Sequence, residues 1–296
     1  MDFLISFNPH LTIGACEIGV LISYALFGVT TVQAYIYYGR FPNDDSKLKA
    51  LVTLVWVCLL VQVVSAGHTI YTVTISDFGH FFRILGPAPK SLGVSIFAGG
   101  VITVAVQGFF TYRIYVFTKR LYIPMISWCM SFLRLLGITT VFVTELQMAS
   151  ISGYVEQWGW LFTTVWCVSV ANDFTITATL VAHLMSHRSR IHKRSVPLVD
   201  KLVMWTIETG MLTSITAIVV MVCFVTMRDN FIWLGVYVTV PGLFSNSFLA
   251  SLNSRAKLRE TRDSLPILTN FAAGLPPWPK ASVEQMSKGM LVHHAT

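Results

Sequence analysis

The side chains in this chain that are best suited to bind a ligand or to transfer a proton lie inside apolar segments. Asn172 and Asp173 are adjacent in the stretch VANDFTITATLVAHL, and Arg134 and Glu208 interrupt other apolar runs in the same way. A charged group at bilayer depth costs at least about 2.5 to 3.5 kcal/mol, so such groups usually face the interior of a helix bundle and find partners there. Residues of this kind can serve as a ligand site, as a general acid, or as a pair that fixes how helices pack.

The depths of these residues can be compared if each is counted from the inner end of its expected helix. At about 1.5 Å per residue, Arg134 lies roughly 18 Å deep and Asp173 roughly 16 Å deep, so the two can form a buried ion pair. Glu208 and Asn246 both lie at roughly 9 Å and can hydrogen-bond if their helix faces meet. A purely structural role for the Arg134 and Asp173 pair is at least as good an interpretation, because buried ion pairs tend to specify arrangement more than they stabilise.

Three further ionisable residues, Glu17, His68 and Glu145, lie toward the outer ends of their helices. They are candidates for lining a pocket that opens outward, and solvation at the membrane surface is the alternative interpretation. We expect no metal ion and no cofactor. Asn172 and Asp173 begin the Asn-Asp-x-x-Asp motif of diphosphate-binding prenyltransferases, but Ile176 stands at its last position. The last expected helix has no lysine near its middle, which excludes a retinal Schiff base.

These buried polar groups require membrane helices to position them. The chain is 54% hydrophobic and only 12% charged, with a mean hydropathy of +0.65, whereas a soluble domain carries about 25% charged residues. It contains seven apolar runs of the length needed to cross roughly 30 Å of hydrocarbon. The predicted fold class is therefore all-α, a polytopic seven-transmembrane-helix bundle with helices at residues 13–38, 48–74, 92–117, 122–146, 159–184, 202–227 and 231–252.

The distribution of basic residues predicts the orientation of this bundle. The loops expected on one side of the membrane carry the basic residues Arg83, Lys90 and Arg228. Most other lysines and arginines fall in the loops on the opposite side and in the tail. By the positive-inside rule the amino terminus is outside and the carboxyl terminus is cytosolic. The basic loop 185–201 is interpreted as an orientation signal, or as a site for a cytosolic partner or anionic lipid together with the tail. The net charge of +7 is thus a topology signal, and no nucleic-acid partner is expected.

The predicted organisation is one seven-helix transmembrane domain at residues 10–253 followed by a cytosolic tail at residues 254–296. The tail mixes charge, proline and serine without an apolar helical face, so we expect it to be largely disordered. The predicted location is an integral, multi-pass position in a lipid bilayer.

Several stretches together resemble a known family. They are FGVTTVQAYIYYGRFPNDD, LKALVTLVWV, VANDFTITATL, IETGMLTSI and NSFLASLNSR. The chain resembles seven-helix membrane proteins of mushroom-forming fungi that are catalogued as domain of unknown function 6534, over most of residues 10–255. Asn172, Asp173 and residues 209–213 and 246–255 match recurrent patterns of that family. The resemblance implies the fold and the membrane location, and it supplies no activity.

Three functions are compatible with these patterns. The first is a receptor-like protein in which a small apolar or lipid-like ligand enters the bundle, pairing changes around Asp173, Arg134 and Glu208, and the basic inner surface contacts a cytosolic partner. The second is a membrane enzyme of the cyclase or isomerase type, in which Asp173 or Glu208 acts as a general acid on an alkene or epoxide. The third is a structural protein without an enclosed pocket. The first is favoured, because enzymes of this kind usually show more than one acidic motif.

Overall fold

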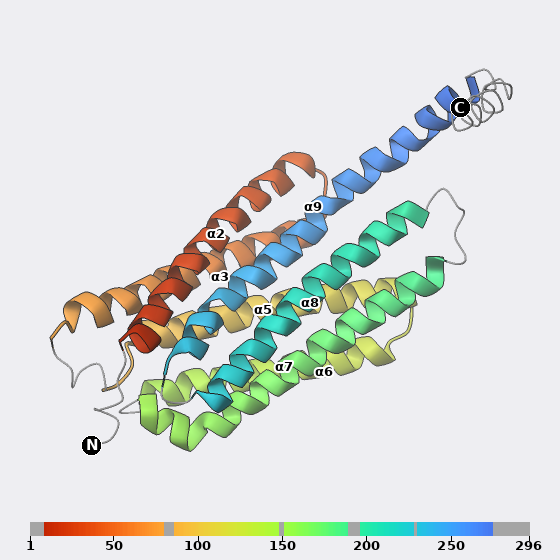
Figure 1. Ribbon diagram of the computed structural model, residues 1–296. Coiled ribbons are helices and arrows are strands. Elements are labelled where there is room, and N and C mark those ends of the chain that lie inside the picture. Colours follow the sequence, from red (N-terminus) through yellow and green to blue (C-terminus); the bar gives the residue numbers. More distant parts are fainter. Residues whose placement is uncertain (1–8, 80–85, 148–150, 189–195, 228–229, 275–296) are drawn as a thin grey trace, which may run out of the picture. The chain divides into compact units, whose positions relative to one another are not determined.

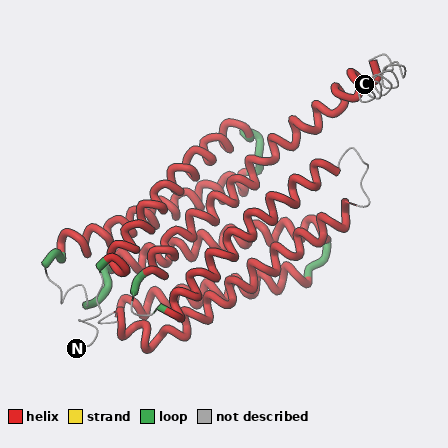
Figure 2. Tube along the Cα trace, viewed as in Figure 1, coloured by secondary structure: helices red, strands yellow, loops and turns green. Residues whose placement is uncertain are grey.

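The computed structural model describes residues 9–79, 86–147, 151–188, 196–227 and 230–274 (Figure 1). For residues 117, 151–152, 154–155, 184, 187–188, 196–209 and 256–274 the description covers the backbone alone. The described residues form helices joined by short connections, and they contain no strand (Figure 2). The elements in chain order are η1 (His10–Gly14), α2 (Ala15–Arg40), α3 (Ser46–Tyr71), η2 (Thr72–Ser76), α5 (Lys90–Thr118), α6 (Tyr122–Gln147), α7 (Ile151–Arg188), α8 (Val196–Thr226) and α9 (Ile232–Gly274).

Each of the seven predicted apolar runs coincides with one of the α-helices, apart from up to three residues at an end. In the described part of the chain, six helical segments are long and apolar enough to cross a membrane, and α8 contributes the shorter apolar segment Gly210–Thr226. Large apolar side chains also cover the outside of the bundle. Ile18 is 60% exposed, Phe132 59% and Phe174 70%, an outer surface that suits lipid better than water. The prediction of an all-helical chain with several helices suited to cross a membrane is confirmed for the described residues.

The helix ends differ from the prediction at several places, among them the starts of α7 and α8, which lie before the predicted residues 159 and 202. Short π-helical segments, η1 and η2, extend α2 at its start and α3 at its end. Helix α9 does not end at residue 252 as predicted but continues to Gly274, because the sequence AKLRETRDSL after the apolar run consists mainly of good helix formers. The predicted disorder therefore does not describe the backbone of residues 254–274, and residues 275–296 lie outside the described part. The chain divides into two compact units, Met1–Ala256 and Lys257–Thr296.

Within the first unit, helices that follow one another in the chain pack side by side (Figure 1). Contacts join α2 to α3, α3 to α5, α5 to α6, α6 to α7, and α7 to α8, and α5 also contacts α7. Helix α9 returns to the first helices, where the side-chain amides of Asn246 and Asn253 donate to the carbonyls of Leu26 and Gln33 on α2. Helix α5 and the part of α9 up to Arg255 are the most buried of the apolar segments.

Small residues bring the central helices together. A Cβ added at Gly99 of α5 would lie 2.7 Å from Pro241 of α9, and one added at Gly19 of α2 would collide with the carbonyl of Gly235 on α9. Glycines at helix crossings allow this close backbone approach in membranes. Helix α5, at whose crossing with α9 Gly99 lies, is thus closely packed within the bundle.

Candidate functional site

The buried face of α7 carries the polar residues that the sequence singled out. Ser169, Asn172 and Asp173 are 1%, 1% and 5% exposed, and their spacing of three and four residues places them on one side of the helix. The hydroxyls of Thr175 and Thr179 on the same helix instead donate to carbonyls one turn earlier, Ala171 and Thr175. Such threonines need no partner on another helix. Asp173 and its two polar neighbours therefore lie in the interior of the bundle.

Asn172 is the centre of a hydrogen-bond network between three helices. Its Nδ2 donates to Gln107 Oε1 on α5 (3.2 Å) and to Ser131 Oγ on α6 (3.0 Å), and Ser127 Oγ on α6 donates to its Oδ1 (2.6 Å). The hydroxyl of Ser127 also lies 2.8 Å from that of Thr111 on α5. These polar atoms are buried and paired with one another, so this level of the bundle is filled by side chains.

The sequence indicated only part of this network. It singled out Asn172, but it did not identify Thr111, Ser127 or Ser131. A signal for them was present, because Ser127, Ser131 and Arg134 recur at four and three residues along α6. This spacing puts all three on one helix face.

Arg134 and Asp173 share the interior of the bundle but do not form the direct ion pair that their matching depth suggested. Arg134 Nη1 donates to Ser169 Oγ, and its guanidinium carbon lies 5.9 Å from the centre of the Trp166 ring. Asp173 Oδ1 accepts from Gln107 Nε2 at 2.5 Å. Arg134 Nη1 and Asp173 Oδ1 thus each bond to another residue. Within the described part of the chain, Arg134 Nε and Asp173 Oδ2 have no hydrogen-bond partner.

Of Asn246 and Glu208, the two residues predicted nearer the inner end, the structure describes the side chain of Asn246. Asn246 Nδ2 donates to the carbonyls of Leu26 (3.0 Å) and Gly242 (2.8 Å), so it ties α9 to α2. Glu208 belongs to α8, but its side chain lies outside the described residues. The predicted Glu208–Asn246 hydrogen bond therefore stays a prediction.

A small cavity, called here the Asp173 cavity, lies between α5, α7, α8 and α9. Its volume is about 30 Å³, and it is lined by Gln107, Phe110, Asp173, Ile176, Thr177, Leu180, Gly210, Thr213, Phe244 and Ser247. An occupant the size of one water needs about 10 to 15 Å³. This cavity therefore admits a water molecule or a small ion, and it excludes a lipid-like molecule.

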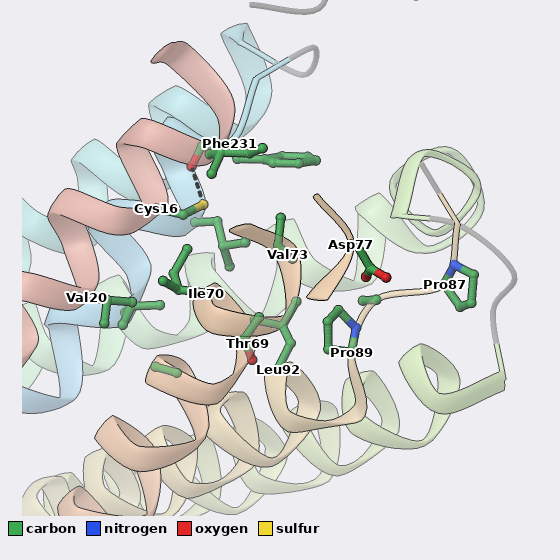
Figure 3. Close-up of a pocket in the computed structure, with 15 residues that line it drawn as sticks. Cys16, Val20, Thr69, Ile70, Val73, Asp77, Pro87, Pro89, Leu92 and Phe231 are labelled. Atoms are coloured by element: carbon green, nitrogen blue, oxygen red, sulfur yellow. Dashed lines mark hydrogen bonds between the residues drawn. The ribbon is translucent and has the colours of Figure 1, made fainter. Parts of the chain in front are cut away.

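A second cavity, called here the apolar pocket, lies where α2 and α9 begin, α3 ends and α5 begins (Figure 3). Its volume is about 70 Å³, and its walls include Ile13, Cys16, Val20, Ala66, Ile70, Val73, Pro87, Pro89, Leu92, Phe231, Leu234 and Val238. The Cys16 thiol points toward the Phe231 carbonyl, with 3.7 Å between sulfur and oxygen (Figure 3). Thr69 also lines the pocket, and its hydroxyl donates to Ser65 O and contacts Ser91 Oγ. The pocket thus offers mainly apolar surface.

The ionisable residues predicted near the outer ends flank this pocket or lie apart from it. Glu17 and His68 are exposed and do not line it; their chain neighbours Cys16 and Thr69 do. His68 Nδ1 lies 3.0 Å from Ser91 Oγ. Glu145 is half-buried against Gly93 of α5, and its Oε2 has no hydrogen-bond partner in the described structure.

No group of three or more His, Cys, Asp or Glu residues suited to a metal ion occurs among the described residues. The chemistry that these residues offer is therefore hydrogen bonding by a buried carboxylate, amides and hydroxyls at one level, and apolar binding at the end of the bundle.

Comparison with known proteins gives one match. Neither the curated proteins nor the solved structures contain a match to this chain. Residues 169–257 match the model of a family described as Family of unknown function (DUF6534). The matched segment begins at Ser169, includes Asn172 and Asp173, and runs through α8 into α9. The fungal origin that the resemblance implied stays a prediction, whereas the similarity of residues 169–257 to this family of unknown function is established.

Proposed function

We propose that this chain is a receptor-like integral membrane protein that binds a small apolar molecule in the apolar pocket. The observation that carries the proposal is the pocket itself, an apolar cavity of about 70 Å³ bordered by parts of four helices. An engineered cavity of about 150 Å³ binds benzene. The apolar pocket is smaller, so it suits a short alkyl group, either as a whole ligand or as the end of a longer lipid-like molecule.

The floor of the pocket connects to polar contacts deeper in the bundle. Val238 of α9 lines the pocket, and its carbonyl accepts from Gln62 Nε2 on α3 (3.1 Å) and from Ser23 Oγ on α2 (3.3 Å). Gln62 Nε2 also lies within 3.4 Å of Ser95 Oγ on α5. A ligand that displaces Val238 would change bonds to three other helices. That arrangement supports a receptor-like role, because a ligand acts only through contacts that differ between two states.

The proposed orientation places the apolar pocket outside and the carboxyl terminus in the cytosol, with seven crossings. It is supported by basic residues at the other end of the helices, where Arg255 Nη2 lies 2.6 Å from Asp44 Oδ2 and Arg113 Nη1 donates to Ser251 Oγ at 2.6 Å. Arg40 ends α2 at the same end. Basic residues gather on the cytoplasmic side of membrane proteins. A cytosolic partner would contact this surface and the loop 185–201, of which residues 189–195 lie outside the described part.

The two alternative functions are less well supported. The enzyme hypothesis needs room for a substrate beside Asp173, and the Asp173 cavity of about 30 Å³ is too small for a lipid-like molecule. The structural hypothesis predicted no enclosed pocket, and the apolar pocket argues against it.

The proposal can be tested by filling the pocket. Val73 lines the pocket, whereas Val64 of α3 is 58% exposed and does not line it. The probes are linear alcohols from butanol to octanol, added to the purified protein in lipid nanodiscs, and the readout is the thermal unfolding midpoint. At least one alcohol should raise the midpoint of the wild type and of Val64→Phe, whereas Val73→Phe should lose this shift because the added ring occupies the cavity. Equal shifts in all three proteins would refute a ligand site in this pocket.

A further inference from the structure

The Asp173 cavity brings together a small space between helices and a carboxylate oxygen without a partner in the described structure. Asp173 is 5% exposed and lines the cavity. Its Oδ1 accepts from Gln107 Nε2, whereas its Oδ2 has no hydrogen-bond partner in the described structure. A buried polar atom left without a partner costs about 1 to 3 kcal/mol, and a charged one costs more. The carboxylate therefore has an unmet requirement for a donor or a cation.

The nearest described cation does not meet this requirement directly. Arg134 bonds to Ser169, which lies one helical turn before Asp173 on α7. The cavity is instead lined by Thr177, which lies one turn after Asp173. The guanidinium of Arg134 thus lies toward the start of α7 from Asp173, and the cavity lies toward the end of α7. A second positive charge in the cavity would be separated from Arg134 by the carboxylate that attracts both.

The other polar residues of the wall offer oxygen ligands. Thr177, Thr213 and Ser247 carry hydroxyl groups and come from α7, α8 and α9 respectively. Hydroxyl oxygens have lone pairs for a cation, and oxygen ligands suit hard cations, whereas soft metals select sulfur. Among the described residues of the wall there is neither His nor Cys, and Asp173 is the one carboxylate. This low ligand charge favours a monovalent ion over Ca²⁺ or Mg²⁺.

We infer that the Asp173 cavity is a binding site for a small monovalent cation, Na⁺, held by the Asp173 carboxylate with hydroxyl oxygens of Thr177, Thr213 and Ser247. The volume of about 30 Å³ exceeds the roughly 10 to 15 Å³ that a water-sized occupant requires. The bound ion ties α7 to α8 and α9, so it stabilises the folded bundle by an amount that rises with the logarithm of its concentration above the Kd. This inference goes beyond the proposed ligand binding, because the Asp173 cavity and the apolar pocket share no residue.

The experiment measures binding of ²²Na⁺ to the purified full-length protein in nanodiscs, with N-methyl-D-glucamine chloride holding the ionic strength constant. Wild type should bind a single ion per chain, and unlabelled Na⁺ should displace it. Asp173→Asn keeps the side-chain shape and should abolish binding. Ser247→Ala should weaken binding by about tenfold, the loss of one ion contact. Ser245→Ala is the matched control, because Ser245 is also buried in α9 but donates to Pro241 O and does not line the cavity.

The thermal unfolding midpoint gives a second measurement on the same samples. The midpoint of wild type and Ser245→Ala should rise when Na⁺ replaces N-methyl-D-glucamine, and that of Asp173→Asn should not change. Absence of ²²Na⁺ binding by the wild type would overturn the inference and indicate a cavity that holds water only. Equal binding by the wild type, Asp173→Asn and Ser247→Ala would also overturn it. If Asp173→Asn does not fold, Ser247→Ala and Ser245→Ala still decide the result by their difference.

Discussion

Replacement of Asn172 with alanine tests whether the buried network holds α5, α6 and α7 together. The substitution removes three hydrogen bonds, with Gln107, Ser131 and Ser127. Interhelical hydrogen bonds in membrane proteins average about 0.6 kcal/mol and reach about 1.7 kcal/mol, so three of them predict a loss of about 2 kcal/mol and at most about 5 kcal/mol. The lower value is expected, because the Ser127 hydroxyl keeps Thr111 as a partner and Gln107 keeps Asp173 and Ser131.

The free energy of unfolding can be measured by reversible unfolding in mixed micelles, with helical circular dichroism followed as the fraction of denaturing detergent increases. Thr175→Ala is the matched control. Thr175 lies one turn from Asn172 on the same helix, but its hydroxyl donates to the carbonyl of Ala171 within that helix. Its removal should change the unfolding free energy by less than about 0.5 kcal/mol. If Asn172→Ala costs no more than Thr175→Ala, the network does not stabilise helix association and the reasoning from its geometry fails.

Three further substitutions test other contacts by the same measurement. Gly19→Ala should lower the free energy of unfolding by about 1 to 3 kcal/mol, because its methyl group would meet a carbonyl of α9 in a crossing with no room for it. Gly28 has open space around it, so the control Gly28→Ala should be neutral or stabilising. Equal effects of the two substitutions would show that the crossing is not close. Arg134→Ala should lower the free energy of unfolding by about 3 to 5 kcal/mol because it leaves Asp173 as an uncompensated buried charge. The double variant with Asp173→Asn should recover part of this loss. Strictly additive losses would show that the two charges are not coupled. Asp44→Ala should cost about 1 kcal/mol at low salt through loss of its ion pair with Arg255 of α9, and less at high salt. A cost independent of salt would exclude an electrostatic origin.

The membrane helices could be predicted because their length and apolarity are properties of single segments. The rise per residue also gives the depth of a side chain in advance, and Arg134 and Asp173 do approach the same buried region. Depth does not fix the rotation of each helix about its axis. The sequence therefore could not show that Arg134 would meet Ser169 and that Asp173 would meet Gln107.

The serines of the network and the apolar pocket could not be predicted from the sequence, for two different physical reasons. Serines give a weak signal in an apolar helix, because a hydroxyl can always return to its own backbone; Ser127 and Ser131 bond across helices only because Asn172 faces them. The apolar pocket depends on how four helix ends come together, and such ends are not periodic in sequence. The sequence offered Glu17 and His68 as lining residues, whereas their exposed side chains do not line the pocket and those of their chain neighbours Cys16 and Thr69 do.

The energies involved show how a small ligand in the apolar pocket could influence the rest of the bundle. Burial of one CH₂ group contributes about 0.8 kcal/mol, so a short alkyl group of four carbons offers about 3 kcal/mol. The bonds that Val238 O receives from Gln62 and Ser23 are worth about 0.6 kcal/mol each in a membrane, so ligand binding can compensate for their loss. A complete shift from 1:99 to 99:1 needs about 5.5 kcal/mol of differential affinity. If the proposed receptor-like function holds, a ligand confined to this pocket would change the equilibrium only in part, and a full response would require a longer molecule whose remaining surface contacts the helices beyond the pocket.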